Sequence, residues 1–125
     1  MHILLDTHVY LWHSNDDDQL SQEARSIILA AESIRISAAT LWEIAIKVRL
    51  GKLKADLADL IDKMEESGFL ELPVYSRHTA QVAKLPLLHG DPFDRMLVGQ
   101  AISESLFLIT ADSQLSQYSN LVIRV

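Results

Sequence analysis

The chain of 125 residues contains no cysteine. This absence excludes disulfide bonds, thiolate nucleophiles and zinc sites built from cysteine, and it agrees with the cytoplasmic location that we expect. The sequence also has no apolar run near the length of about eighteen residues that a membrane-spanning helix needs. Its first residues, MHILLDTHVYLW, have neither a basic leader nor a small-residue cleavage site, so we expect no signal peptide.

Other kinds of chemical site are also absent or weakly supported. The four glycines form no Gly-rich phosphate loop, and no serine has a positioned histidine that would indicate a catalytic triad. His8 and His13 are five residues apart, which differs from the i,i+4 pair of a helical zinc site. We interpret His2 and His78 as surface or packing residues. His89 could contact a substrate or a phosphate, although a loop histidine without a partner is the favoured interpretation.

The charge balance is negative, at −6, with 49% hydrophobic and 22% charged residues. Such a composition is typical of a soluble globular protein. A negative total argues at first against nucleic acid, because binding of phosphates relies on lysine and arginine. The segment KVRLGKLK nevertheless gathers Lys47, Arg49, Lys52 and Lys54. Taken alone, this cluster is best explained as the solvated end of a helix, where cations suit the dipole.

Short apolar runs alternate with helical patterns along the chain. Strands are predicted at HILL (2–5), IRIS (34–37), FLELPV (69–74), LFLIT (106–110) and LVIRV (121–125). Helices are predicted near 8–13, 21–32, 41–50, 56–68, 76–85 and 93–105, with one or two helical turns at 112–118. The length fits one domain over residues 1–125. The alternation predicts an α/β fold with a mostly parallel central sheet covered on both faces.

Acidic residues follow the predicted strands at their ends. Asp6 comes directly after the first strand, Glu43 lies one helical turn after the second, and Asp112 follows the fourth. Asp91 and Asp94 open the helix that leads to the fourth strand. In an open parallel sheet the functional crevice lies beyond the carboxyl ends of the strands. We therefore expect acids from distant segments to converge at one end of the sheet.

Each acid also has a structural explanation. Asp6 and Asp112 could cap the helices that follow them, and Glu43 could pair with Lys47 one turn later. Glu43 is nevertheless unusual, because it lies in the first turn of a helix that is apolar on nearly every face. A charge in such a place is costly unless a partner compensates it.

The convergence as a whole indicates a metal site. Clustered carboxylates raise one another's pKa and require a compensating cation. With oxygen ligands only, Mg²⁺ or Mn²⁺ is the expected ion, and it could activate a water and neutralise a phosphoryl group. Four carboxylates with one divalent ion leave about two negative charges, which would repel a phosphodiester. We therefore expect either a second ion or a partly protonated carboxylate when substrate is bound.

Four segments together resemble a known family. LLDTHVYLW, SAATLWEIAIKVRLGKL, HGDPFDRMLVGQA and LITADSQLSQY are similar, in order and spacing, to the PIN-domain ribonucleases, and specifically to VapC-type toxins of bacterial toxin–antitoxin pairs. The resemblance runs from residue 1 to about 125. It implies a three-layer α/β/α sandwich, and a metal-dependent endoribonuclease that is the toxin of such a pair.

The resemblance assigns roles to individual residues. Asp6 in LLDT, Glu43 in LWEIA, Asp94 in DPFDRML and Asp112 in ITAD match the four acids of the family, which would bind Mg²⁺ or Mn²⁺ and activate water to cut RNA. Family members commonly form homodimers and are inhibited by a cognate antitoxin that fills the active-site groove. The family pattern also places hydroxyl groups beside the site, here those of Thr7 and Thr110. Some members carry a further acid after the fourth, where this chain has Ser113 and Gln114; whether Asp91 or water takes its place stays open.

Two other classes of function remain as alternatives. A receiver-like phosphoacceptor also gathers acids and Mg²⁺ at sheet ends, but it usually needs an acid pair near the first strand and a lysine after the last. This chain has one acid in LLDTH and offers Arg124 in LVIRV. A catalytically silent PIN-like module that only binds RNA or a protein partner is the other alternative, and the presence of all four acids argues against it.

The roles of the two aspartates in HGDPFDRML can be distinguished only in part. Asp91 precedes Pro92, which favours the first helical position, so Asp91 is placed as the N-cap. Asp94 is then at the third helical position, where a carboxylate also suits the positive helix end. Helix stability explains both residues equally. The family pattern assigns Asp94 to the metal and leaves Asp91 mainly as a cap.

Overall fold

The computed structural model describes all residues, 1–125, and contains one five-stranded sheet. The strands are β1 (His2–Leu5), β2 (Ser33–Ser37), β3 (Leu70–Leu72), β4 (Phe107–Thr110) and β5 (Val122–Arg124). They are ordered β3-β2-β1-β4-β5, and every neighbouring pair is parallel. The predicted parallel sheet is therefore confirmed, and it is parallel throughout.

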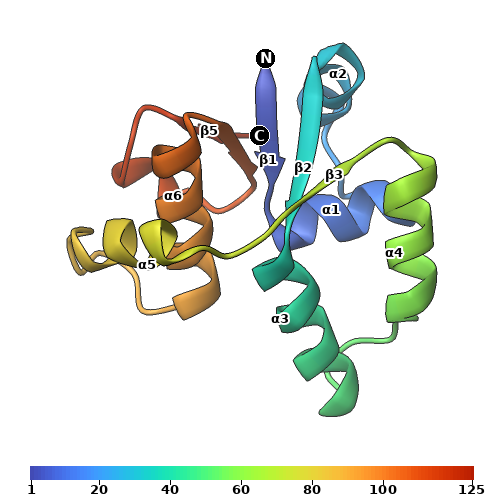
Figure 1. The fold of residues 1–125 in the computed structure, drawn as a ribbon. Coiled ribbons are helices and arrows are strands. Elements are labelled where there is room, and N and C mark those ends of the chain that lie inside the picture. The colour runs from blue at the N-terminus through green and yellow to red at the C-terminus, as the bar shows by residue number, and fades with distance from the viewer.

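Helices connect the strands. They are α1 (Thr7–Ser14), α2 (Gln22–Ala30), α3 (Ala38–Arg49), α4 (Leu57–Glu66), α5 (Ser76–Ala83) and α6 (Pro92–Glu104), with a short 3₁₀ helix, η1 (Leu115–Gln117). None of them is long and apolar enough to cross a membrane. The helices lie on the two faces of the sheet, with α1, α2 and α4 to one side and α5 and α6 to the other, while α3 extends from the carboxyl end of β2 (Figure 1).

Side chains alternate between the two faces of each strand, and this produces two separate hydrophobic cores. Ile3 and Leu5 of β1 pack among residues of α1 to α4, whereas Leu4 between them packs with residues of α6. Side chains on opposite faces of a strand follow from its period of two residues. Because helices cover both faces of the sheet, the central strands β1 and β4 are largely apolar, whereas β2 and β3 carry the charged residues Arg35 and Glu71. The predicted three-layer α/β/α sandwich is confirmed.

Local signals set the ends of α3, the helix that carries Glu43. The Ser37 hydroxyl accepts a hydrogen bond from the backbone N–H of Ala39 at 3.0 Å, so Ser37 is the N-cap. Gly51 ends the segment in the left-handed region, with φ of 73°. Only a glycine adopts this conformation without strain. These caps fix α3 directly against the carboxyl end of β2.

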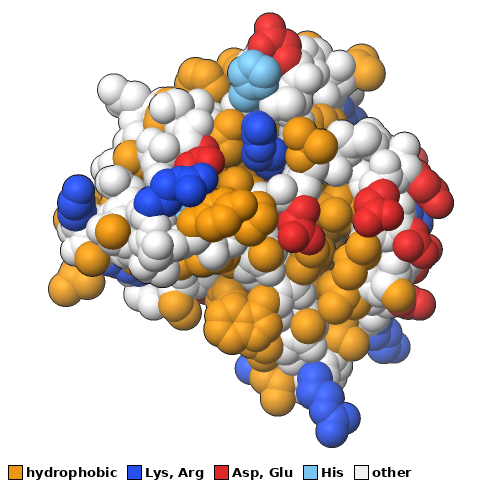
Figure 2. Space-filling model, viewed as in Figure 1, with side chains coloured by type: hydrophobic (Ala, Val, Ile, Leu, Met, Phe, Trp, Pro, Cys, Tyr) orange, Lys and Arg blue, Asp and Glu red, His pale blue; other side chains and the backbone are white.

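The helix α3 is not buried on all sides, although its sequence is apolar nearly all round. Trp42 is 63% exposed, while Ile44 is fully buried. In the space-filling view, hydrophobic side chains gather over α3 and between α3 and α6, and basic side chains lie at the far end of α3 (Figure 2). The apolar composition of this helix therefore produces a hydrophobic surface in addition to a buried face.

Candidate active site

The structure places the four predicted acids at the same end of the sheet, where the strands have their carboxyl ends. The group whose ligand atoms lie within 4.8 Å of one another consists of Asp94, Asp112 and His89. Thr110 at the end of β4 contacts both the carboxylate of Asp6 and the backbone of Asp112. His89 lies between the carboxylates of Asp112 and Asp94. The negative charges of Asp6 and Glu43 also act on Asp94 and raise its pKa. The expected convergence of acids from distant segments is therefore observed.

Asp6 is fixed by two hydrogen bonds at the start of α1. One carboxylate oxygen accepts from the backbone N–H of Val9 at 2.8 Å, and the other accepts from the hydroxyl of Thr110. The residue is only 4% exposed, and this burial raises the pKa of its carboxyl above the ordinary value. Asp6 thus caps α1, as one interpretation of the sequence expected, and its carboxylate also lies among the other acids.

Glu43 is buried, but two partners satisfy its carboxylate. The Thr7 hydroxyl donates to Oε1 at 2.6 Å, and the Lys47 ammonium donates to Oε2 at 2.7 Å. The hydrogen bond to Glu43 raises the pKa of Lys47, and the negative charges of Asp91 and Asp94 raise it further. The predicted pair with Lys47 is therefore present. It provides the cation that a buried charge in this helix requires.

Asp94 lies in the first turn of α6 and has no close cation. Its side chain is 23% exposed. Partial burial, followed by the charges of Asp91, Asp6 and Glu43, raises its pKa from 3.8 to about 7. His89 lowers this pKa but does not offset the other effects. Near neutral pH the Asp94 carboxyl therefore retains its proton far more readily than an ordinary aspartate does when no cation is bound.

Asp112 is oriented by contacts on both carboxylate oxygens. Oδ1 accepts from the backbone N–H of Gln114 at 2.9 Å, and Oδ2 lies 3.3 Å from Nε2 of His89. The backbone N–H of Asp112 donates to the Thr110 hydroxyl at 3.0 Å. Asp112 therefore begins the turn that leads to η1, as expected of a residue with this position, while Oδ2 is directed toward His89.

Asp91 is the N-cap of α6, as the sequence predicted. Its Oδ1 accepts from the backbone N–H groups of Phe93 at 2.8 Å and of Asp94 at 3.2 Å, and Pro92 occupies the first helical position. Asp91 therefore fixes the backbone of Asp94, while its own charge raises the Asp94 pKa.

Two histidines make contacts with acids that the sequence did not predict. His89 was expected to have no partner, yet it contacts two of the acids. Its position two residues before the N-cap Asp91 was the available signal, because that spacing brings the side chain to the helix start. His78, interpreted as a surface or packing residue, is indeed fully buried, and its Nε2 lies 3.2 Å from Glu104, a contact that the sequence did not predict. That pair joins α5 to α6, away from the four acids.

The donor set fits a small divalent cation. The four acids offer only carboxylate oxygens, the ligands that Mg²⁺ and Mn²⁺ prefer. Their mutual repulsion is visible in the raised pKa of Asp94. The ammonium of Lys47 is a fixed positive charge at the site. It reduces four negative charges to three, so a single divalent ion would leave one. Lys47 thus lowers the residual negative charge that a second metal ion would have to neutralise.

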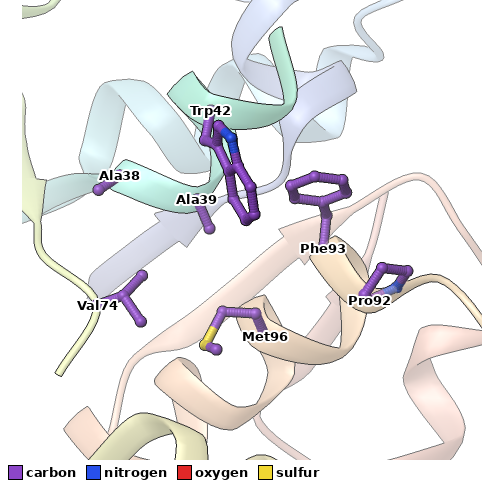
Figure 3. Close-up of a pocket in the computed structure, with 7 residues that line it drawn as sticks. All are labelled: Ala38, Ala39, Trp42, Val74, Pro92, Phe93 and Met96. Atoms are coloured by element: carbon purple, nitrogen blue, oxygen red, sulfur yellow. The ribbon is translucent and has the colours of Figure 1, made fainter. Parts of the chain in front are cut away.

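Two hollows border the acids. One, of about 280 Å³, is lined by Asp6, His8, Trp12, Ala111 and Asp112. The other is an apolar pocket of about 460 Å³ between α3 and α6, in which Trp42 and Phe93 point toward one another with ring centroids 5.3 Å apart (Figure 3). These two aromatic residues directly precede Glu43 and Asp94 in the sequence. The apolar pocket and the acidic site therefore share the N-terminal halves of α3 and α6.

Comparison with known proteins gives consistent matches over nearly the whole chain. The model of the PIN domain family matches residues 3–121. Ribonuclease VapC22 from Mycobacterium tuberculosis is 26% identical over 118 residues, which cover 93% of this chain and 91% of that protein.

Solved structures show the same fold. VapBC2 from Rickettsia felis, bound to a DNA fragment from its promoter, has a TM-score of 0.75 at 19% identity, covering 100% of this chain and 99% of the other. A toxin–antitoxin complex from Klebsiella pneumoniae has a TM-score of 0.68 at 17% identity, covering 97% and 95%.

Proposed function

We propose a function from the premise that this chain belongs to the PIN domain family, whose model matches it from residue 3 to residue 121. The chain is a nuclease of the VapC type that hydrolyses RNA phosphodiesters with Mg²⁺ or Mn²⁺, as the toxin of a toxin–antitoxin pair. The observation that carries this proposal is the convergence of Asp6, Glu43, Asp94 and Asp112 at the carboxyl ends of the strands, with only one lysine to compensate them.

In this proposal the four carboxylates hold the divalent ion. When bound, the ion supplies a water of lowered pKa and neutralises charge on the phosphoryl group. The chain's own groups orient the ligands: Thr110 holds Asp6, Thr7 holds Glu43, and the turn after Asp112 holds that carboxylate. Outer partners of this kind fix the direction of a ligand oxygen. Lys47 adds a positive charge that reduces repulsion of the phosphodiester.

The test is cleavage of a labelled single-stranded RNA. Wild-type protein with Mg²⁺ is expected to cut it, whereas EDTA, Asp6→Asn or Asp94→Asn is expected to abolish cleavage. Asp59→Asn, which removes an exposed acid of α4, is the matched control and should leave the rate unchanged. Cleavage that survives chelation or both site substitutions would overturn the proposal.

An antitoxin protein is the proposed regulatory partner, and the cytoplasm, where RNA is available, is the proposed location. The similar folds in toxin–antitoxin complexes support the partner. We place the partner's inhibitory segment over the hollow beside Asp6 and Asp112, where it would exclude RNA. Co-expression with a cognate antitoxin should abolish RNA cleavage by the purified complex, and cleavage should return when the antitoxin is removed by proteolysis. An unchanged rate in the complex would contradict this role.

A second copy of this chain is the proposed occupant of the apolar pocket. Trp42 is 63% exposed, and Val74 on the same pocket is 41% exposed, so a water-exposed aromatic surface borders the acids. Burial of such a surface in a homodimer would bring two acidic sites near one another. Sedimentation should give a dimer for the wild type and for Leu29→Asp, which changes an exposed leucine elsewhere, but a monomer for Trp42→Asp. A monomeric wild type would contradict this assignment.

A further inference from the structure

His89 is held between two of the proposed ligands. It lies in the segment between α5 and α6, and its side chain is 15% exposed. Nε2 is 3.3 Å from Oδ2 of Asp112 and 3.6 Å from Oδ2 of Asp94. By distance alone these three side chains could surround a metal ion, because their ligand atoms lie within 4.8 Å of one another. Whether His89 is a ligand or a hydrogen-bond donor is therefore the question that its geometry must answer.

The other ring nitrogen gives the answer. Nδ1 lies 3.0 Å from the backbone N–H of Asp91. A backbone N–H can only donate, so Nδ1 must be the acceptor and carries no proton. The proton of the neutral ring is then on Nε2, the nitrogen that faces the two carboxylates. A metal ion could bind Nε2 only if the proton moved to Nδ1, where it would oppose the Asp91 N–H.

The segment that carries His89 is fixed on the next helix. The guanidinium of Arg95 donates to the carbonyl oxygen of Pro86 at 2.8 Å, to that of Leu85 at 3.4 Å and to the hydroxyl of Tyr118 at 3.1 Å. The Tyr118 hydroxyl in turn lies 3.5 Å from the carbonyl oxygen of His89. Contacts to the backbone of His89 and the hydrogen bond from Asp91 to the ring therefore both fix the position of the imidazole.

We propose that His89 is a positioning residue for the metal site and not one of its ligands. Its Nε2–H donates to Asp112 beside Asp94, so it holds the two carboxylates near one another against their repulsion. The carboxylate oxygens that it leaves free are the ones available to the ion. This inference rests on the proposed function, because it assumes that the acids bind Mg²⁺ or Mn²⁺.

The tautomer provides a direct spectroscopic test. In ¹⁵N-labelled protein, two-bond correlations of the histidine rings distinguish a protonated from an unprotonated nitrogen, and loss of one set of signals in His89→Gln identifies His89. We expect Nε2 to carry the proton both without metal and with saturating Mg²⁺. Loss of the Nε2 proton when Mg²⁺ is added would show direct ligation and overturn the inference.

Metal affinity gives a second readout that does not depend on RNA cleavage. Mn²⁺ titrated by calorimetry should bind His89→Ala about 10–100-fold more weakly than wild type, the usual effect of removing an outer partner of a ligand. His89→Gln, whose amide can both accept and donate, should recover part of the affinity. His2→Ala, at the opposite end of β1, is the control and should bind as wild type does.

The outcomes separate this inference from the proposed function. Unchanged Mn²⁺ affinity in His89→Ala would overturn the inference alone. Normal Mn²⁺ binding by the wild type without any RNA cleavage would overturn the proposed nuclease and leave the positioning role intact. Absence of Mn²⁺ binding by the wild type would overturn both the positioning role and the metal dependence.

Discussion

Asp6 and Glu43 are each only 4% exposed, whereas the side chains of Asp94 and Asp112 are 23% and 39% exposed. We call the first pair the buried half of the site and the second pair the open half. In the buried half, hydroxyls and the Lys47 ammonium satisfy the carboxylates. In the open half, both carboxylates face a single histidine nitrogen.

This difference indicates a division of labour. The buried half has its hydrogen-bond partners in place within the protein, so its geometry is set during folding. In the open half, partial burial, followed by the neighbouring negative charges, raises the pKa of the Asp94 carboxyl to about 7. A bound divalent ion would offset the repulsion between these carboxylates, so we expect metal binding to change the Asp94 pKa most.

The largest expected effect is loss of cleavage when a ligand is removed from either half. Asp6→Ala and Asp94→Ala should each lower RNA cleavage by more than the roughly 10–100-fold that loss of an outer partner causes. The two variants should differ in urea unfolding, because Asp6 also caps α1. Asp6→Ala should lose about 1 kcal/mol of stability, whereas Asp94→Ala should lose little. Equal losses of stability would contradict the distinction between the halves.

Removal of a supporting hydroxyl should have the next largest effect. Thr7→Val keeps the shape of the side chain but removes the donor to Glu43 at 2.6 Å. Cleavage should fall by roughly 10–100-fold. Thr79→Val, on the exposed part of α5, is the matched control. A Thr7→Val enzyme with the wild-type rate would show that Glu43 needs no orientation from this side chain.

A smaller effect is expected at the helix cap beside the open half. Asp91→Ala removes the acceptor for two backbone N–H groups of α6 and should cost about 1 kcal/mol of stability. Most of the activity should remain, because Asp91 is not one of the proposed ligands. Thermal unfolding and RNA cleavage, measured on the same preparation, would check both parts. If Asp91→Ala is inactive while Asp94→Ala is active, the roles of the two residues are reversed.

The last prediction concerns stability and pH rather than the rate of cleavage, and it follows from the proton on Asp94. The Asp94 pKa is about 7 in the folded protein, whereas an ordinary aspartate has a pKa of 3.8. Between these two pH values the folded protein therefore keeps a proton that the unfolded chain has lost. This contribution to wild-type stability is full below about pH 4 and is lost as the pH rises through about 7. Without metal, Asp94→Asn should therefore gain stability relative to wild type across this range. Denaturant unfolding in EDTA measures the difference, and a difference independent of pH would contradict the shifted pKa.

Much of this arrangement could be predicted because it depends on local signals. Spacings within one turn of a helix predict the caps Asp6 and Asp91 and the pair of Glu43 with Lys47. The strand ends follow from the short apolar runs. The parallel sheet follows from the alternation of strands and helices, which brings those ends together.

The remainder depends on contacts between segments without a periodic pattern. His89 lies 23 residues before Asp112 and reaches it from an irregular segment. His78 meets Glu104 only because α5 packs on α6, and that contact has no signal in the sequence of either helix. The exposure of Trp42 also depends on packing, because its apolar neighbours along α3 gave no indication of which side would face water.

The most direct test is the location of Mn²⁺ in a crystal of the wild-type protein. We predict an anomalous peak from an ion that carboxylate oxygens of both halves bind, including those of Asp6 and Asp94, with His89 outside the coordination sphere. The same peak should be absent from crystals of Asp94→Asn grown and soaked in the same way. A fully occupied ion bound away from these carboxylates, or one retained at the same place in Asp94→Asn, would contradict the account.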